Sequence, residues 1–231
     1  MLTITKSTFL KYVILCLTLI FSIEGIKAQV NSFELDSSKF KKELLPILDT
    51  IYKDDQSYRV ALGKLVKLNA KTLQIDSVKN IIVKKDSINL VKVNEYLKQH
   101  GWLGPQEVGM NGSQGIFLVI QHADLATQKK YLPLIKQAEK DGKTLSSNLA
   151  ILEDRIAMRE GRRQVYGSQG FKDKVTGKSY IYPTIDVDNL DSRRKAMGLP
   201  PMSTYVANWK LEDYKRNLSE IESIVKQQNI R

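Results

Sequence analysis

Two histidines are the residues of this chain best suited to proton-transfer chemistry. His122 lies in Gln121-His122-Ala123-Asp124, directly after the unbroken hydrocarbon run at 116–120. Such a run is typical of a buried segment, so it brings an imidazole and a carboxylate out of the protein interior. Imidazole titrates nearest neutral pH, which makes His122 the first candidate for a general acid or base.

The other histidine, His100, ends a predicted helix at 86–100 and is followed by Gly101 and Trp102. Glycine and then an apolar residue are typical of a helix end with the glycine in a left-handed conformation. A histidine in the last turn also interacts favourably with the helix dipole. His100 therefore has a structural explanation as well as a catalytic one.

A carboxylate interrupts the first series of apolar residues at helical spacing, which begins at Phe40. We call such a series a stripe. Where an apolar residue is due, the chain has Asp54-Asp55, and Arg59 follows Asp55 by four residues. Asp55 and Arg59 can pair on one helix face, and a carboxylate in a core stripe is costly unless it is paired or lines a pocket. In the alternative interpretation, the first helix ends near Asp54 and Asp55 caps the next one.

Asp124 also has two interpretations. In a continuing helix, two steps of about 100° would place His122 and Asp124 on opposite faces. The two can act together only if the helix ends near His122. Asp124 alternatively caps the helix predicted at 127–140.

The whole pattern predicts a mainly α fold (α-rich, α+β), a single compact helical domain over residues 29–231. Gly104-Pro105 and the glycines at 109, 112 and 115 predict a loop. A small β-hairpin is expected around residues 163–183, with strands at 164–169 and 178–182 and a turn at Thr176-Gly177. The remaining expected elements are a helix at 145–160, a short helix capped by Asp188, and a C-terminal helix at 205–228.

The N-terminus reads as a signal peptide over residues 1–28. Lys6 and Lys11 precede an apolar stretch at 13–23, and Ala28 ends a plausible cleavage site. We expect an exported protein, periplasmic or secreted, with an uncleaved N-terminal anchor as the alternative and no membrane span after cleavage. Cleavage would remove Cys16, the only cysteine, and with it any thiol nucleophile or cysteine metal site.

The chain carries a formal net charge of +11, mostly as lysines spread along helical stretches. No aromatic residues are interleaved with them as nucleic-acid stacking would require, so we expect no nucleic-acid partner. The lysines form either a solvated basic face or a surface for an anionic partner.

Several common chemistries lack their motifs. The chain has no close histidine pair for zinc, no Gly-x-Ser-x-Gly elbow and no phosphate-binding glycine loop. A zinc site from His100, His122 and a carboxylate is the remaining metal alternative. The sequence otherwise predicts no metal and no cofactor.

The polar motifs of the chain, in their order along the sequence, resemble those of an uncharacterised bacterial family, domain-of-unknown-function family 6624. The similarity spans roughly residues 50–205, and Ser168 stands where many relatives have threonine. The resemblance supports the boundaries and the choice of residues, and it implies no activity. The motifs that carry it are Asp55-Gln56 with Arg59, His100-Gly101-Trp102, Gln121-His122-Ala123-Asp124, Asp154-Arg155, Gln164 with Tyr166-Gly167-Ser168-Gln169, and Arg193-Arg194 with Gly198-Leu199.

Polar residues drawn from many elements more often converge on one pocket than serve separate structural roles. The first hypothesis is a hydrolase or lyase acting on a polar or anionic extracellular substrate. The second is a binding module for an anionic or glycan ligand, and the third is a buried polar network with a structural role. The expected partner is a polar small molecule or glycan, and the sequence predicts no oligomeric state. The candidate catalytic residues are His122, His100, Asp55 and Asp124, and the candidate ligand-binding residues are Gln56, Arg59, Gln121, Asp154, Arg155, Gln164, Tyr166, Gln169, Arg193 and Arg194.

Overall fold

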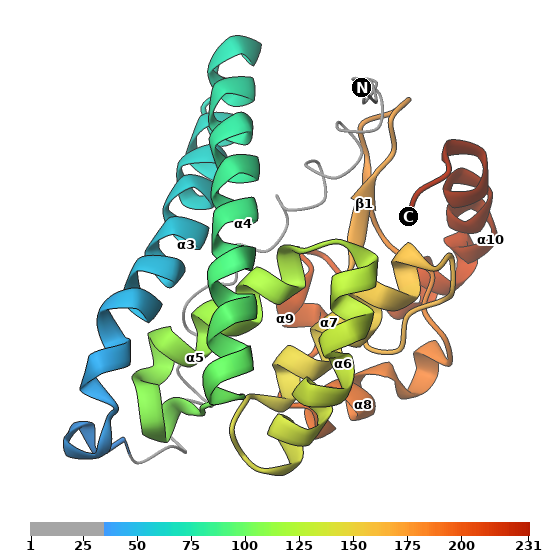
Figure 1. Ribbon diagram of the computed structural model, residues 1–231. Coiled ribbons are helices and arrows are strands. Elements are labelled where there is room, and N and C mark those ends of the chain that lie inside the picture. Colours follow the sequence, from blue (N-terminus) through green and yellow to red (C-terminus); the bar gives the residue numbers. More distant parts are fainter. Residues whose placement is uncertain (1–34) are drawn as a thin grey trace. The chain divides into compact units, whose positions relative to one another are not determined.

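The computed structural model describes residues 35–231 (Figure 1). The chain divides into two compact units, an N-terminal unit (Met1–Thr144) and a C-terminal unit (Leu145–Arg231). The predicted signal peptide, with Cys16, lies outside the described residues. Between residues 35 and 231, no helix combines the length and the apolar character that crossing a membrane requires.

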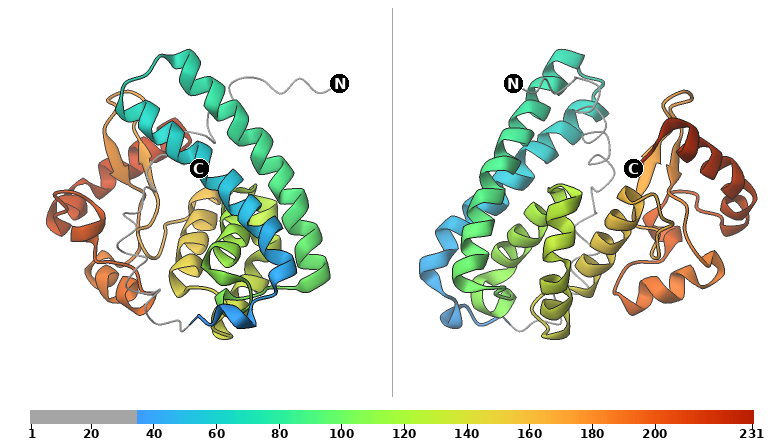
Figure 2. Two further views of the ribbon diagram at one scale, coloured as in Figure 1. Left: turned by 90° about the vertical axis from the view of Figure 1, so that its left-hand side faces the viewer. Right: turned by 45° about the vertical axis from the view of Figure 1, so that its right-hand side comes forward.

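The N-terminal unit is helical. Two short 3-10 turns, Ser37–Lys39 and Lys42–Leu44, precede α3 (Leu45–Lys67), α4 (Thr72–His100), α5 (Pro105–His122) and α6 (Leu125–Lys140). Helices α3 and α4 form a long antiparallel hairpin whose turn end projects beyond α5 and α6 (Figures 1 and 2). The prediction of a helix at 127–140 is confirmed by α6, and the helix predicted at 86–100 is the second half of α4.

Helix α3 packs closely against α5, and this contact forms the main core of the unit. Leu48 and Ile51 of α3 and Ile116 and Ile120 of α5 are fully buried. The projecting half of the hairpin has its own small core, in which Leu62 and Ile82 are surrounded by Tyr58, Ile75 and Val78. Each half of α3 is therefore held by apolar packing.

The loop predicted from the glycines after Gly104 is wrong, because these residues belong to α5. Only Gly109, with φ of +70°, interrupts the helix. A Cβ atom on Gly112 would lie 3.2 Å from Leu48 Cδ1, and one on Gly115 would lie 3.2 Å from Tyr52 Cβ. The glycines at 112 and 115 thus allow α5 to approach α3 closely. In the sequence, glycines with this packing role look the same as glycines that form a loop.

The C-terminal unit contains α7 (Ser146–Arg159), a β-hairpin and a group of helices. Strands β1 (Gly170–Lys172) and β2 (Ser179–Ile181) are antiparallel, with Phe171 opposite Tyr180. They are followed by a 3-10 turn, η4 (Val187–Asn189), and by α8 (Leu190–Ala196), α9 (Met202–Tyr205) and α10 (Leu211–Gln228). With eight α-helices and one two-stranded sheet among residues 35–231, the predicted mainly α fold is confirmed.

Three boundaries in this unit differ from the prediction. Residues 164–169 do not form a strand. Gln164 makes only an isolated parallel bridge to Thr184, and the next N–H groups bond to side chains instead of a strand partner. Asp188 does not cap α8, which begins after Asn189 without a side-chain cap. The C-terminal helix begins at Leu211 instead of 205, after a turn in which Asn208 has φ of +58°.

Candidate functional site

Helix α3 carries Asp55 on its buried face. The helix runs without interruption from Leu45 to Lys67, so Asp55 lies in mid-helix and the capping alternative is wrong. Its side chain is 1 % exposed and shares the core stripe of Leu48 and Ile51. A carboxylate at such a position needs partners, and it has three.

The first partner of Asp55 is His122, the last residue of α5. The Nδ1 atom of His122 lies 2.9 Å from Asp55 Oδ1, and the His122 side chain is 8 % exposed. Helix α5 ends here because Ala123 adopts an extended conformation. The end of a helix built on a buried hydrocarbon run thus brings the imidazole to the carboxylate of Asp55.

Gln56 and Arg59 are the other two partners. Gln56 donates from Nε2 to Asp55 Oδ2 over 2.6 Å, and the NH1 group of Arg59 lies 3.5 Å from Asp55 Oδ1. The NH2 group of Arg59 also donates to both oxygens of Asp86 on α4, over 2.9 and 2.8 Å. Asp55, Gln56, Arg59, Asp86 and His122 together form what we call the Asp55 network.

The two carboxylates of the network have pKa values displaced in opposite directions. Burial raises the pKa of Asp55, but His122, Arg59 and Gln56 outweigh burial and hold that pKa below the ordinary value of 3.8. Burial dominates at Asp86 and raises its pKa, against the attraction of Arg59 and with a further push from the charge of Asp55. Asp55 is therefore ionised at neutral pH.

An ionised carboxylate at Nδ1 determines the tautomer of a neutral histidine. The proton stays on Nδ1 and points at Asp55, so Nε2 is the basic nitrogen of His122. When Nε2 takes up a proton, the adjacent carboxylate stabilises the resulting imidazolium. This arrangement can perform general acid–base chemistry.

The remaining candidates of the N-terminal unit have structural contacts. Asp124 caps α6 by accepting a hydrogen bond from the Thr127 N–H over 2.7 Å, which confirms the capping interpretation. The carbonyl of buried Gln121 accepts from Gln128 Nε2 over 2.6 Å. His100 is exposed at the end of α4, with its ring centroid 5.2 Å from that of Tyr96.

In the C-terminal unit, Asp154 of α7 organises the loop at 165–168. Its buried carboxylate accepts hydrogen bonds from the N–H groups of Val165, Tyr166 and Ser168, over 2.7, 3.0 and 2.9 Å. Burial raises the pKa of Asp154, and the three N–H donors oppose that rise. These hydrogen bonds to the backbone make Asp154 an anchor of the loop.

Gln164 and Gln169 close the base of the hairpin. Gln164 donates from Nε2 to the carbonyls of Gln169 and Tyr182, over 3.0 and 2.7 Å, and its Oε1 accepts from the Gln169 N–H over 2.8 Å. Gln169 Nε2 in turn donates to Ser168 Oγ over 2.9 Å. Gln164 thus ties the two ends of the 164–169 loop to each other and to Tyr182, the residue directly after β2.

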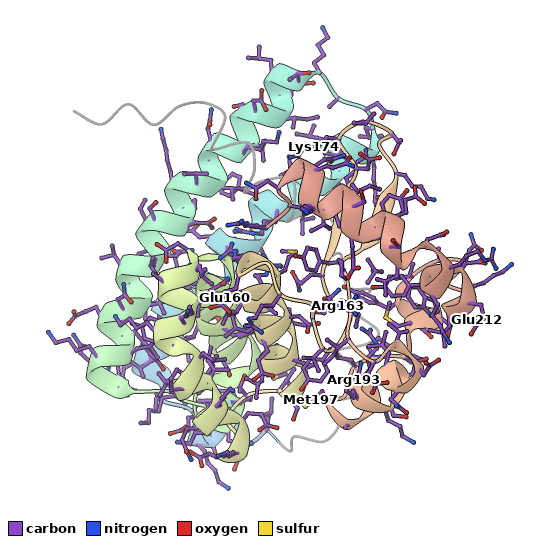
Figure 3. All side chains as sticks on the ribbon, turned by 90° about the vertical axis from the view of Figure 1, so that its right-hand side faces the viewer. Glu160, Arg163, Lys174, Arg193, Met197 and Glu212 are labelled. Atoms are coloured by element: carbon purple, nitrogen blue, oxygen red, sulfur yellow. The ribbon has the colours of Figure 1, made fainter. Side chains whose placement is uncertain are left out.

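Two arginines of α8 hold the same loop. Arg193, labelled in Figure 3, donates to the carbonyls of Val165, Ile185 and Asp186. Arg194 donates to the carbonyls of Tyr166 and Pro200, over 2.7 and 2.6 Å. Arg155 is 1 % exposed within α7.

Only part of the predicted set therefore comes together. The Asp55 network of the N-terminal unit contains Asp55, Gln56, Arg59 and His122, and it does not contain His100. Within residues 35–231, no three His, Cys, Asp or Glu side chains are grouped so that they could hold a metal ion.

Comparison with known proteins identifies the family. A model of a family of unknown function, DUF6624, matches residues 39–216, more than three quarters of the chain. The chain belongs to the DUF6624 family. The match is wider at both ends than the expected 50–205, and it includes every residue of the Asp55 network. No curated protein and no solved structure is significantly similar to the chain.

Asp86 of this DUF6624 member is not among the site residues predicted from the sequence. Asp86 and the fully buried Asn89 lie on the same face of α4 as Val93 and Leu97, at three- and four-residue spacing. A polar residue on a core stripe is the signal that singled out Asp55. Asp86 lies on the core stripe of α4, one turn further toward the N-terminus, so the same signal applies to it.

Proposed function

We propose that this protein is an enzyme of the hydrolase or lyase class, with His122 as general acid–base and Asp55 as its orienting carboxylate. The observation that carries the proposal is the 2.9 Å contact between His122 Nδ1 and the buried carboxylate of Asp55. Together with the predicted export signal and the net charge of +11, it favours a polar or anionic extracellular substrate.

The energetic cost of the network supports a catalytic role. Burying ionised groups carries a desolvation penalty that their attraction does not always repay. Displaced pKa values of neighbouring carboxyls are typical of sites that use one group as a base and keep another in a different protonation state. Asp55 and Asp86 show such opposite displacements.

In the proposed mechanism, His122 Nε2 removes a proton from water or from the substrate. Asp55 stabilises the imidazolium, and the same proton then passes to the leaving group. Arg59 and Gln56 keep the carboxylate oriented, since each contacts one of its oxygens. Positioning of this kind contributes to catalysis because the oriented carboxylate fixes the tautomer and the ring plane of His122.

The test is a hydrolase screen of the purified chain against ester, phosphodiester and glycoside substrates. His122→Ala should lower activity by about 10²- to 10⁴-fold, the usual contribution of a general acid–base. His100→Ala is the matched control, because His100 is the other histidine of the chain and lies outside the network. Equal activity of the His122→Ala variant and the wild type would overturn the assignment.

A second candidate function, glycan binding without turnover, is favoured by a hollow on the surface of the N-terminal unit. The hollow has a volume of about 640 Å³ and contains amide, hydroxyl and aromatic groups, including Asn111, Ser57, Tyr52 and Gln56. Such groups are suited to sugar hydroxyls and rings. Under this alternative, Gln56→Ala abolishes glycan binding on an array, and His122→Ala does not.

A further inference from the structure

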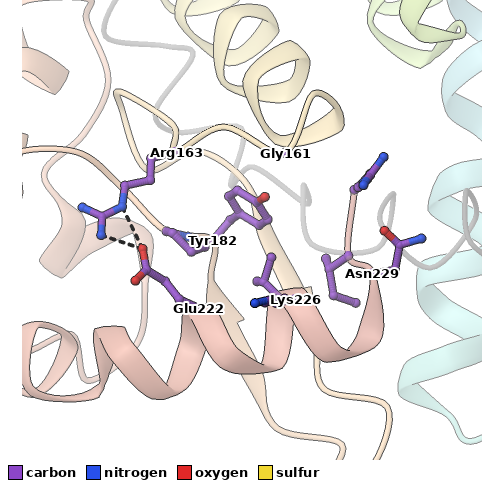
Figure 4. Close-up of a pocket in the computed structure, with 10 residues that line it drawn as sticks. Gly161, Arg163, Tyr182, Glu222, Lys226 and Asn229 are labelled. Atoms are coloured by element: carbon purple, nitrogen blue, oxygen red, sulfur yellow. Dashed lines mark hydrogen bonds and ion pairs between the residues drawn. The ribbon is translucent and has the colours of Figure 1, made fainter.

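The C-terminal unit contains a pocket whose lining includes no residue of the Asp55 network. It has a volume of about 320 Å³ and lies between the residues after α7, the chain after β2 and the last turns of α10 (Figure 4). Its lining combines cationic side chains with an apolar wall. The residues that matter here are Arg163, Tyr182, Glu222, Val225, Lys226 and Arg231.

The pocket has an excess of positive charge. Arg163 is neutralised by Glu222, with its Nε 2.7 Å and its NH2 2.6 Å from Glu222 Oε1. Within residues 35–231, neither Lys226 nor Arg231 has a carboxylate in ion-pair distance. Two cations of the lining are therefore available to a ligand.

Tyr182 supplies a hydrogen-bond donor to the same space. The residue is 2 % exposed, yet its hydroxyl makes no hydrogen bond to any described residue, although its carbonyl accepts three. Burial raises the pKa of Tyr182, the positive charge of Arg231 opposes that rise and the negative charge of Glu222 adds to it, so the hydroxyl is close to both. The Tyr182 hydroxyl is thus a donor that a ligand in the pocket can use.

The apolar wall of the pocket is fixed in place. The Tyr182 ring packs edge-on against Phe171, with centroids 6.3 Å apart, and Pro183, Val225 and Ile230 complete the lining. In Figure 4 the Tyr182 side chain lies between α10 and the segment at Gly161. A ligand that fills this space needs an apolar body as well as an anionic head.

We propose that this pocket binds a phosphate monoester with an apolar body of about the size of one ring. The dianionic phosphate would balance the charges of Lys226 and Arg231 and accept the hydrogen bond of the Tyr182 hydroxyl. The ring would lie against Val225 and the Tyr182 ring. This site is independent of the function proposed for His122.

Phenyl phosphate is the probe, titrated into the full chain and followed by amide chemical shifts. The expected result is saturable binding that shifts residues of α10 and the hairpin, tighter than the binding of benzoate or inorganic phosphate. Benzoate lacks the second charge, and inorganic phosphate lacks the ring. Binding of inorganic phosphate as tight as that of phenyl phosphate, or no saturable binding at all, would overturn the proposal.

Three variants locate the site. Tyr182→Phe should weaken binding about fivefold, the effect of one lost hydrogen bond. The melting temperature should not change, because the hydroxyl bonds to none of the residues that the structure describes. Lys226→Gln should weaken it roughly tenfold through loss of a charged donor. Lys210→Gln removes the same charge at the opposite end of α10 and should leave binding unchanged. Equal weakening by both lysine variants would show only general attraction to a basic protein.

Discussion

The imidazole of His122 and the carboxylate of Asp55 lie 2.9 Å apart, although 67 residues separate them in the chain. Each is carried by a helix whose buried face is mainly apolar, and the close approach of α3 and α5 brings the two together. The contact is therefore set by the packing of the helices. Its strength and its pH dependence can be measured without knowing a substrate.

Asp55→Asn should destabilise the protein by roughly 3 kcal/mol, because it leaves Arg59 and His122 beside a neutral group in a buried site. Urea unfolding followed by circular dichroism measures the change. Asp49→Asn is the matched control, since Asp49 is an exposed residue of the same helix. A loss of stability no larger than that of the control would contradict the assigned role of the buried carboxylate.

The stabilisation by Asp55 should depend on pH with a defined sign. The pKa of Asp55 in the folded protein lies below 3.8, so the ionised group stabilises the fold above that pH. This contribution is lost as the pH falls through the folded-state pKa. The difference in unfolding free energy between the wild type and Asp55→Asn should therefore shrink as the pH falls below the ordinary carboxyl pKa of about 4. A difference that grows below that pH would contradict the direction of the shift.

The tautomer of His122 gives a third test. Nitrogen NMR of the labelled protein should show the neutral His122 ring with its proton on Nδ1, because that nitrogen faces an ionised carboxylate. His100 provides a second, exposed imidazole in the same spectrum. Asp55→Asn should change the His122 signals and leave those of His100 in place. A neutral His122 protonated on Nε2 would contradict the assigned geometry.

Much of this arrangement is predictable from local sequence. The capping role of Asp124, the end of α4 at Gly101 with φ of +64°, and the pairing of Asp55 with Arg59 all depend on residues within four positions of each other. Short-range signals of this kind follow from helix geometry.

The rest depends on contacts between distant elements. The sequence alone could not show that Asp55 meets His122 or that Arg59 reaches Asp86, because those contacts require the packing of α3 against α4 and α5. The same limit explains the loop error. The glycines of α5 leave room for the neighbouring helix α3, and turn propensity carries no information about a neighbouring helix.

That packing role gives a fourth prediction. Gly115→Ala should destabilise the protein by about 1–3 kcal/mol, because the added methyl meets the Tyr52 backbone, which cannot move aside. A Cβ atom there would lie 3.3 Å from both Cα and N of Tyr52. Gly112→Ala should cost less, since its nearest neighbour is the side-chain atom Leu48 Cδ1. Thermal unfolding of the two variants measures the ranking, and the reverse order would contradict the close backbone contact.

The loop anchored by Asp154 gives the last prediction. Asp154→Asn turns one carboxylate oxygen into an amide donor, which faces N–H groups that also donate. The amides of Val165, Tyr166 and Ser168 should therefore exchange with solvent faster, by at least about tenfold if one buried hydrogen bond is lost. Amide exchange measured by NMR resolves these three positions, and Asp188→Asn on the exposed 3-10 turn is the control. Unchanged protection of all three amides would mean that the loop keeps its conformation without the carboxylate.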